Sequence, residues 1–347
     1  MALLQLAIQG DGDAFGELAG AYRAELRAHC YRMLGSVHDA EDALQDAMLR
    51  AWRGLPGFAG RGSVRSWLYS IATNAAIDIA RHRSRREFPV DFGPAGGQGA
   101  DLDDPLTEVA WLEPCPDTWL AGDATVSPEA RYEQRESVEL AFVVALQHLP
   151  PLQRAVLLLR EVVGLSTAEI SRQMGTSTAA VNSALQRARA ATRDRLPARS
   201  QQQVLRALGD QRIKALAERY ADAMERGDAD AVISMLTQDA TWSMPPIPTW
   251  FRGREAIREF LVRYPLAERW KHCTARASGQ LAIGCYLTGQ EGGGYDPACI
   301  DVLTLDGDQI AAVTGFLSAR PLQPPLSRAW IAGDELFARH GLPARLP

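Results

Sequence analysis

The sequence predicts a multidomain protein with two all-α parts followed by an α+β domain. Apolar residues recur at helical spacing through residues 1–87 and again through 131–196. An acidic stretch rich in Pro and Gly, residues 88–130, separates these two parts. Residues 212–320 instead mix helical patterns with β-rich runs. A length of 347 residues fits two or three domains at about 150 residues each.

The first all-α part contains two helices with functional interest, expected over 37–52 and 63–86. Ser36 is a typical N-cap for the first helix, and its Asp39, Asp42 and Asp46 share one face. Such a face is usually just solvated, although it could also dock a basic partner. The second helix ends in the basic run 81–86, which carries more charge than a helix C-terminus requires. That excess favours contact with phosphates.

The second all-α part ends in two short helices, expected over 167–173 and 178–194. The turn 174–177 contains Gly175, so the layout is that of a helix-turn-helix. Val181, Leu185 and Ala188 are predicted to face inward in the second helix. The side chains predicted to face outward are Asn182, Gln186, Arg187 and Arg189. Such side chains read base edges and hold phosphates, whereas the plainer alternative is two amphipathic helices of a bundle.

Charge is distributed unevenly along the chain. The net charge of −5 and the pI near 5.8 argue at first against nucleic-acid binding. However, residues 88–130 carry nine acidic side chains and no basic one, so the helical parts on either side are mildly basic. The acidic stretch is predicted to be a linker without regular structure. Because it contains Trp111 and Trp119, we expect short docked segments in an otherwise mobile stretch.

Several classes of protein and site are not expected. No apolar run approaches the roughly 20 residues that span a bilayer, and the first residues lack the basic region of a signal peptide. The five cysteines are scattered and form no CxxC pair, so neither a structural zinc site nor a disulfide framework is expected. The sequence therefore predicts a cytoplasmic protein without a cofactor or a bound metal, and with no membrane partner.

The α+β domain offers candidates for a small-molecule pocket. Aromatic residues of its expected helices and strands could line such a pocket, although in a small domain they more often form plain core. These candidates are Tyr220, Trp242, Trp250, Phe251 and Tyr286. An enzyme would also need a placed acid or base, for which Asp222, Asp239, His272 and Asp301 are available. None of these four lies in a recognisable catalytic signature, so no catalytic residue is predicted.

Two stretches carry a resemblance to bacterial sigma factors of the extracytoplasmic-function type. Residues 10–86 resemble sigma region 2 through the stretches 39–46 (DAEDALQD) and 66–74 (SWLYSIATN). Residues 139–195 resemble region 4 through 149–154 (LPPLQR) and the helix-turn-helix. Residues 212–320 resemble the SnoaL-like cone fold, which some sigma-factor subgroups carry as a C-terminal extension.

The resemblance implies a division of the chain and a role for each part. The expected parts are region 2 (1–87), an acidic linker (88–130), region 4 (131–197), a SnoaL-like domain (205–325) and a C-terminal tail (326–347). Region 2 would bind core RNA polymerase and the −10 promoter element, and region 4 would bind the −35 element. The acidic linker would thread the polymerase channel. The implied partners are the polymerase β and β′ subunits, promoter DNA and a possible ligand of the C-terminal domain.

The resemblance also assigns residues to these roles. The residues implied for the β′ subunit are Asp39, Glu41, Asp42, Gln45 and Asp46. Those implied for the −10 element are Arg61, Ser63, Arg65, Trp67, Asn74, Asp78, Arg81 and Arg85. Those implied for the −35 element are Thr178, Ala179, Asn182, Ser183, Gln186, Arg187 and Arg189.

The chain departs from the family pattern where Asn182 and Ala184 replace residues that are often basic, which predicts weaker phosphate anchoring. Two other functions stay open from the sequence. One is a helix-turn-helix regulator that works without polymerase, and the other is a fusion whose SnoaL-like domain is an enzyme. The region 2 stretches favour the sigma factor, because a plain repressor has no use for them.

Overall fold

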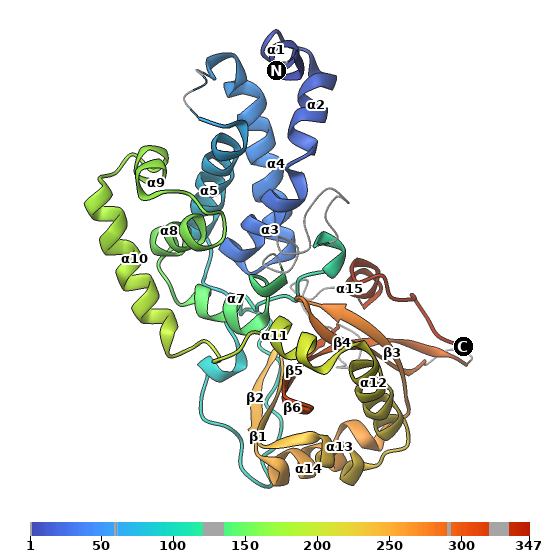
Figure 1. Ribbon diagram of the computed structural model, residues 1–347. Coiled ribbons are helices and arrows are strands. Elements are labelled where there is room, and N and C mark those ends of the chain that lie inside the picture. The colour runs from blue at the N-terminus through green and yellow to red at the C-terminus, as the bar shows by residue number, and fades with distance from the viewer. Residues whose placement is uncertain (1, 59, 61, 121–134, 290–292, 319–332) are drawn as a thin grey trace. The chain divides into compact units, whose positions relative to one another are not determined.

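The computed structural model describes residues 2–58, 60, 62–120, 135–289, 293–318 and 333–347. The chain forms two compact units (Figure 1). The first contains residues 1–86 and 119–197, and the second contains 87–118 and 198–347. The expected combination of helical parts with a later α+β domain is confirmed. Within the described ranges, no helix is long and apolar enough to cross a membrane.

The first unit begins with a bundle of helices. Its members are α1 (Ala2–Ile8), α2 (Gly12–Gly20), α3 (Arg23–Leu34), α4 (Val37–Gly54) and α5 (Val64–His82). Ser36 caps α4 as expected, since its Oγ accepts a hydrogen bond from the Asp39 amide at 3.2 Å. Ser63 caps α5 in the same way through the Ser66 amide. The bundle core forms where α3, α4 and α5 bury their apolar faces against one another.

The rest of this unit is the helix-turn-helix part, which includes α7 (Leu140–Gln147) and α8 (Pro151–Glu161). They precede α9 (Thr167–Gln173) and α10 (Thr178–Arg193), the two helices of the motif. Buried Arg154 of α8 joins this part to the bundle. Its guanidinium donates to the Met33 carbonyl of α3 and to the carbonyls of Gln147 and Leu149, at 3.0 and 3.1 Å.

The second unit is built on a mixed sheet. Among its described residues, six strands pair in the order β2-β1-β6-β5-β4-β3, with β1 and β6 parallel and the other pairs antiparallel. The strands are β1 (Leu236–Met244), β2 (Ile247–Arg252), β3 (Trp270–Ala277), β4 (Gln280–Thr288), β5 (Tyr295–Asp306) and β6 (Gln309–Leu317). Gly307 turns the chain from β5 into β6 at a positive φ of 58°, as glycine does in a tight β-hairpin.

Helices of the second unit enclose one face of this sheet. They are α11 (Gln201–Leu208), α12 (Asp210–Glu225), α13 (Ala229–Met235) and α14 (Arg254–Arg263). Helix α15 (Gly333–Arg339) packs on the opposite face, where the Phe337 ring contacts the ring of Tyr286. The largest apolar cluster described in this unit draws side chains from α12, α13 and α14 and from one face of β1, β2, β4, β5 and β6. This cluster is the core of the α+β domain.

Three elements differ from the sequence expectations. Helix α5 ends at His82 rather than at 86, because Arg83 takes extended backbone angles. The stretch 201–208, for which no helix was expected, is helical because Val204 and Leu205 bury against the domain core. Strand β2 was not expected, since its residues 247–252 follow two prolines.

The acidic segment is docked rather than mobile where it is described. Residues 87–118 belong to the second unit and lie on the α+β domain with little regular structure. The Gly96 amide donates to the Trp250 carbonyl at 2.7 Å, and the Leu106 amide donates to the Pro246 carbonyl at 3.0 Å. We call residues 87–118 the acidic strap. The strap is ordered because strand β2 gives its backbone donors an acceptor edge, which composition alone does not reveal. Residues 121–130 of the expected linker lie outside the described residues.

Candidate nucleic-acid interface

The acidic face of α4 divides into a buried and an exposed part. Asp39 is only 2% exposed, and its carboxylate forms ion pairs with Arg83 and Arg86. Burial is tolerated because two guanidiniums compensate the charge. Asp39 therefore holds the basic segment after α5 in place and does not lie on the surface with the other acidic residues, contrary to expectation.

The remaining residues of this face are accessible. Gln45 is exposed, while Glu41, Asp42 and Asp46 are half-buried. Their ion pairs are local, with 3.3 Å from Arg27 to Glu41 and 2.7 Å from Arg50 to Asp46. Partly exposed pairs of this kind contribute little to stability and exchange readily for a new partner. We call Glu41, Asp42, Gln45 and Asp46 the α4 acidic face.

The start of α5 is held by internal contacts. Arg65 makes a bidentate ion pair with Glu25, with nitrogen–oxygen distances of 2.9 to 3.1 Å. The Tyr69 hydroxyl donates to the same carboxylate at 3.2 Å. Trp67 packs against Phe58, with ring centroids 5.1 Å apart. Two of the residues implied for the −10 element, Arg65 and Trp67, are therefore engaged within the chain.

The helix-turn-helix part covers this same end of α5. The Gln173 side chain of α9 donates to the Ser66 carbonyl at 2.9 Å, and Arg65 donates to the Val163 carbonyl at 3.4 Å. Both contacts join the first turn of α5 to the segment α8–α9. They place region 4 residues on the end of α5 that is implied to meet promoter DNA.

Farther along, α5 is more open. Ser63, Asn74 and Arg81 are exposed, and Asp78 accepts from Arg50 at 2.9 Å. Arg85 lies beyond the end of the helix, where its guanidinium meets the His148 ring at 2.6 Å. The expected helix over 63–86 is thus wrong for Arg85, because α5 ends at His82. Arg61 lies outside the described residues.

Helix α10 has the two-sided build that the sequence predicts. Val181, Leu185 and Ala188 are buried. All residues implied for the −35 element are exposed, namely Thr178, Ala179, Asn182, Ser183, Gln186, Arg187 and Arg189. Ala184 is 3% exposed and faces inward, so a basic residue at this position would be buried and could not reach a phosphate. The expected weakening of phosphate anchoring therefore does not apply to position 184. Of the exposed set, Arg189 pairs with Glu161 of α8.

The five pocket candidates of the α+β domain do not converge. Tyr220, Trp242 and Phe251 belong to the domain core, where the Tyr220 and Trp242 rings stack 6.4 Å apart. Trp250 and Tyr286 are neighbours of core residues along their strands, so they point to the opposite face of the sheet. There the Trp250 indole donates to Gly93 of the strap, and the Tyr286 hydroxyl donates to Pro343.

Among the four acid–base candidates, Asp301 alone is buried in the core with polar partners. Tyr220 donates to its Oδ2 at 2.8 Å, and burial raises the pKa of this carboxyl group. His272 is buried 3.5 Å from Glu225, and burial lowers its pKa to about 4. Asp222 pairs with Arg226 on the surface, and Asp239 is exposed. These residues form no common catalytic group.

Sequence reasoning missed the partners that organise these surfaces. Glu25, Arg83 and Arg86 form the ion pairs around α5, and Cys285 and Cys299 lie beside Asp301. The two cysteines come together because they are direct partners in the pairing of β4 with β5.

Comparison with family models gives three matches in the order that the motifs suggested. Residues 18–86 match sigma-70 region 2, residues 139–191 match sigma-70 region 4, and residues 217–313 match the SnoaL-like domain.

Relatives match the chain over different lengths. It is 39% identical over 342 residues to the ECF RNA polymerase sigma factor SigG of Mycobacterium tuberculosis, covering 97% of this chain and 85% of that protein. It is 31% identical to SigW of Bacillus subtilis over 188 residues, which covers 54% of this chain and 91% of SigW. The crystal structure of Mycobacterium tuberculosis SigJ has a TM-score of 0.54 at 23% identity and covers 86% of this chain and 94% of SigJ, which shows a shared fold.

Proposed function

This chain belongs to the extracytoplasmic-function sigma factors of RNA polymerase, which direct promoter-specific initiation, and we propose that its C-terminal domain restrains this activity by holding the acidic strap. The observation that carries the proposal is the docking of residues 87–118 on the α+β domain. Core polymerase and promoter DNA are the proposed partners, and the cytoplasm is the proposed location.

The polymerase contact is proposed for the α4 acidic face. Gln45 is exposed, and the three carboxylates beside it hold only partly exposed pairs with neighbouring cations. A basic partner surface can replace those cations at little cost. Asp39 is proposed to act indirectly, by fixing Arg83 and Arg86 next to α5.

The −10 contact is proposed for α5 after rearrangement at its first turn. Asn74 and Arg81 are exposed, whereas Arg65 and Ser66 hold partners in region 4. Separated single-stranded DNA needs aromatic and basic groups along one groove. Binding there therefore requires the α9 contact with Ser66 to open.

The −35 contact is proposed for the exposed face of α10. Asn182 and Gln186 can pair with adenine edges, while Arg187 can read guanine or hold phosphate. All three side chains are exposed. The internal contacts of this surface are peripheral, since Asn182 accepts a long 3.5 Å hydrogen bond from the Thr167 hydroxyl and Arg189 forms an exposed ion pair with Glu161.

The strap links region 2 to region 4 in the chain, so its position controls how both regions reach polymerase. Its docking uses named contacts: the Asp103 amide donates to Thr249 Oγ1 at 2.9 Å, and the Thr249 hydroxyl donates back to the Asp103 carboxylate at 2.6 Å. The Gly99 amide donates to Glu259 at 2.9 Å. A strap that threads a polymerase channel must leave these partners, so docking opposes initiation.

The domain is proposed to be regulatory rather than catalytic. Its named relatives are sigma factors, and its acid–base candidates do not converge. A small-molecule ligand would meet Tyr220, Trp242 and Phe251, the three pocket candidates that share the core face. Such a ligand would change the docking of the strap only if its affinity differed between the docked and the released state of the strap.

The test is promoter-specific run-off transcription with core polymerase and the full chain. Thr249→Val combined with Trp250→Phe removes strap hydrogen bonds, with side-chain volume kept at position 249 and an aromatic ring kept at position 250. Each bond contributes about 1 kcal/mol, so we expect the double variant to initiate at least about 5-fold more strongly at limiting sigma factor. Thr237→Val on β1, outside the strap contacts, is the matched control.

Unchanged transcription by the double variant contradicts restraint by the strap. If transcription requires neither region 2 nor core polymerase, the alternative of an independent DNA-binding regulator is supported instead.

A further inference from the structure

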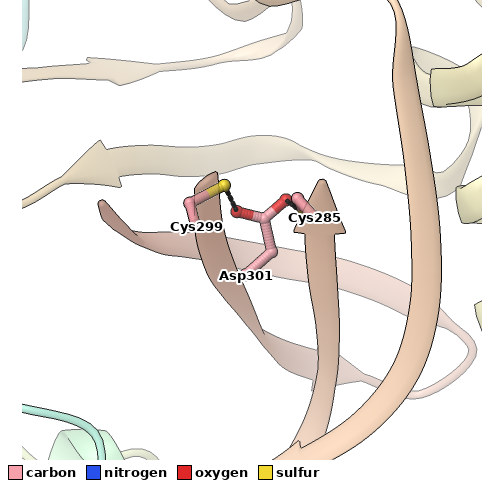
Figure 2. A group of neighbouring side chains, drawn as sticks. All are labelled: Cys285, Cys299 and Asp301. Atoms are coloured by element: carbon pink, nitrogen blue, oxygen red, sulfur yellow. Dashed lines mark hydrogen bonds between the residues drawn. The ribbon is translucent and has the colours of Figure 1, made fainter. Parts of the chain in front are cut away.

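Two buried cysteines and one buried carboxylate meet on the core face of the sheet. Cys285 of β4 is the direct cross-strand partner of Cys299 of β5, and Asp301 follows two residues later on the same face. Figure 2 shows the two cysteines approaching the carboxylate from neighbouring strands. The Cys285 sulfur lies 3.4 Å from Asp301 Oδ2, and the Cys299 sulfur lies 3.7 Å from Oδ1.

These distances match the edges of a tetrahedral metal site. The three donor atoms all lie within 4.8 Å of one another. Zinc binds sulfur at about 2.3 Å and carboxylate oxygen at about 2.0 Å, so tetrahedral geometry places sulfur and oxygen about 3.5 Å apart. The observed separations of 3.4 Å to Oδ2 and 3.7 Å to Oδ1 lie close to this value, one for each oxygen of the carboxylate, so a rotation of this group brings one oxygen to both sulfurs. One ion can therefore reach all three donors with little movement of the strands.

The surroundings hold the carboxylate in position. Tyr220 of α12 donates to Asp301 Oδ2 at 2.8 Å, which is the outer hydrogen bond that ligating carboxylates usually receive. Gly315 of β6 lies opposite Asp301 in the register, and a Cβ at Gly315 would lie 2.9 Å from Oδ1. The absence of a side chain at 315 thus leaves the space that the carboxylate occupies.

We propose that Cys285, Cys299 and Asp301 form a binding site for a thiophilic divalent cation of the zinc type. Two sulfur donors select zinc over magnesium or calcium, which take oxygen ligands. When the ion binds, the thiols of Cys285 and Cys299 release their protons to solvent and bind as thiolates. Tyr220 keeps its hydrogen bond to Asp301. The site lies in the core between α12 and strands β4 and β5, so an ion there ties the helix to the sheet. This proposal does not depend on the sigma-factor activity or on the strap.

The absence of a CxxC pair led the sequence to predict no metal site. The structure supplies a different arrangement, in which the two cysteines come from paired strands rather than from one turn. Strand pairing brings side chains together as effectively as short spacing does, because directly opposite residues have Cβ atoms about 5 Å apart.

The test is titration of the metal-free full chain with Co²⁺, followed by competition with Zn²⁺. We expect a thiolate-to-cobalt charge-transfer band that saturates at a single ion per chain and disappears on addition of Zn²⁺. Cys285→Ser and Cys299→Ser should each abolish the band. Tyr220→Phe should weaken binding about 10-fold, as loss of an outer partner does.

Cys273→Ser is the matched control, because Cys273 lies on β3 outside the cluster, and it should leave the band unchanged. The wild-type titration decides the matter even if a variant fails to fold. Absence of the band in the wild type overturns the proposal. So does its persistence in the Cys285→Ser variant, or a Cys285–Cys299 disulfide in the protein purified without oxidant, detected as the loss of two hydrogens by mass spectrometry.

Discussion

The two proposed DNA-binding surfaces of the first unit are built differently. The polar face of α10 is exposed along its length, and Arg189 is the member of the −35 set that forms an ion pair. The first turns of α5, in contrast, use Arg65 in a bidentate pair with Glu25 and are covered by Gln173 of region 4. The proposed −35 surface on α10 is already exposed. The proposed −10 surface on α5 must first release its internal partners before it can contact DNA.

This difference teaches that the same unit can hold a preformed and a restrained surface. The −35 element is bound as duplex DNA, which does not need to be melted, so a helix that is already exposed can enter its major groove. Single-stranded −10 DNA appears only after melting on polymerase. Under the proposed function, internal partners at α5 keep basic and aromatic groups occupied until polymerase separates region 2 from region 4.

Arg154→Leu should have the largest effect, because Arg154 joins region 4 to region 2. It is buried and donates to the carbonyls of Met33, Gln147 and Leu149. Leaving such acceptors unsatisfied costs about 1–3 kcal/mol each before relaxation, so we expect the free energy of unfolding to fall by about 3 kcal/mol. Urea denaturation measures it, with the exposed Arg172→Leu as control. A loss below about 1 kcal/mol would show that the joint is not held by Arg154.

Acid should weaken the core behind α5. His29 bonds Thr73 of α5 at 2.9 Å, and burial together with Arg32 and Arg65 lowers its pKa to about 3. The unfolded chain binds this proton near pH 6.5 and the folded chain does not, so stability falls as the pH drops below 6.5. The contribution is about 2 kcal/mol at pH 5.

His29→Gln should remove that part of the pH dependence, measured by urea denaturation at pH 7 and pH 5. Residues 161–199, which include α9 and α10, contain no histidine, so the −35 surface lacks this sensitivity. The exposed His82→Gln is the control. An identical pH dependence in wild type and His29→Gln would mean that His29 is protonated in the folded chain.

Arg187→Ala probes the exposed face of α10 that is proposed to bind the −35 element. Loss of one base or phosphate contact should weaken binding to −35 duplex DNA by about 1.5 kcal/mol, or roughly 10-fold. If the lost contact is to phosphate, the salt dependence of binding should also fall by about 0.9 in slope. Fluorescence anisotropy at several salt concentrations measures both quantities, with Arg219→Ala of α12 as control. Unchanged affinity would remove Arg187 from the interface.

Gln173→Ala probes the first turn of α5, which is proposed to bind the −10 element. Of these substitutions it should change the measured free energy least. It removes the hydrogen bond to the Ser66 carbonyl, which contributes about 1 kcal/mol. We expect binding to a single-stranded −10 oligonucleotide to become about 5-fold tighter, because less internal contact must be broken. Arg172→Ala, the adjacent exposed residue, should change nothing. Weaker binding by Gln173→Ala would mean that Gln173 contacts the DNA itself.

Local patterns predicted most of the fold. The cap at Ser36 and the two-sided build of α10 follow from residue types at fixed spacings, and both are present. Strand β2 and the docked strap were missed because they depend on pairing between distant segments. The strap amides of Gly96 and Leu106 find their acceptors at Trp250 and Pro246, far away in the chain.

The candidate sites were predictable to the extent that they consist of single helix faces. The −35 set lies on one helix and is exposed as a whole. Asp39 was misplaced because its burial depends on Arg83 and Arg86, which reach it only after α5 ends early. The cysteine–aspartate cluster was missed because it also depends on contacts between separate segments. The register that pairs Cys285 with Cys299 cannot be read from their spacing in the sequence.

Hydrogen exchange of the strap tests the central claim most directly. The amides of Gly96, Gly99 and Asp103 donate to the C-terminal domain and should be protected in the free protein. We predict that this protection is lost when core polymerase binds, while amides within β4 and β5 keep theirs. Protection that persists at these three amides in a complex active in initiation would contradict release of the strap.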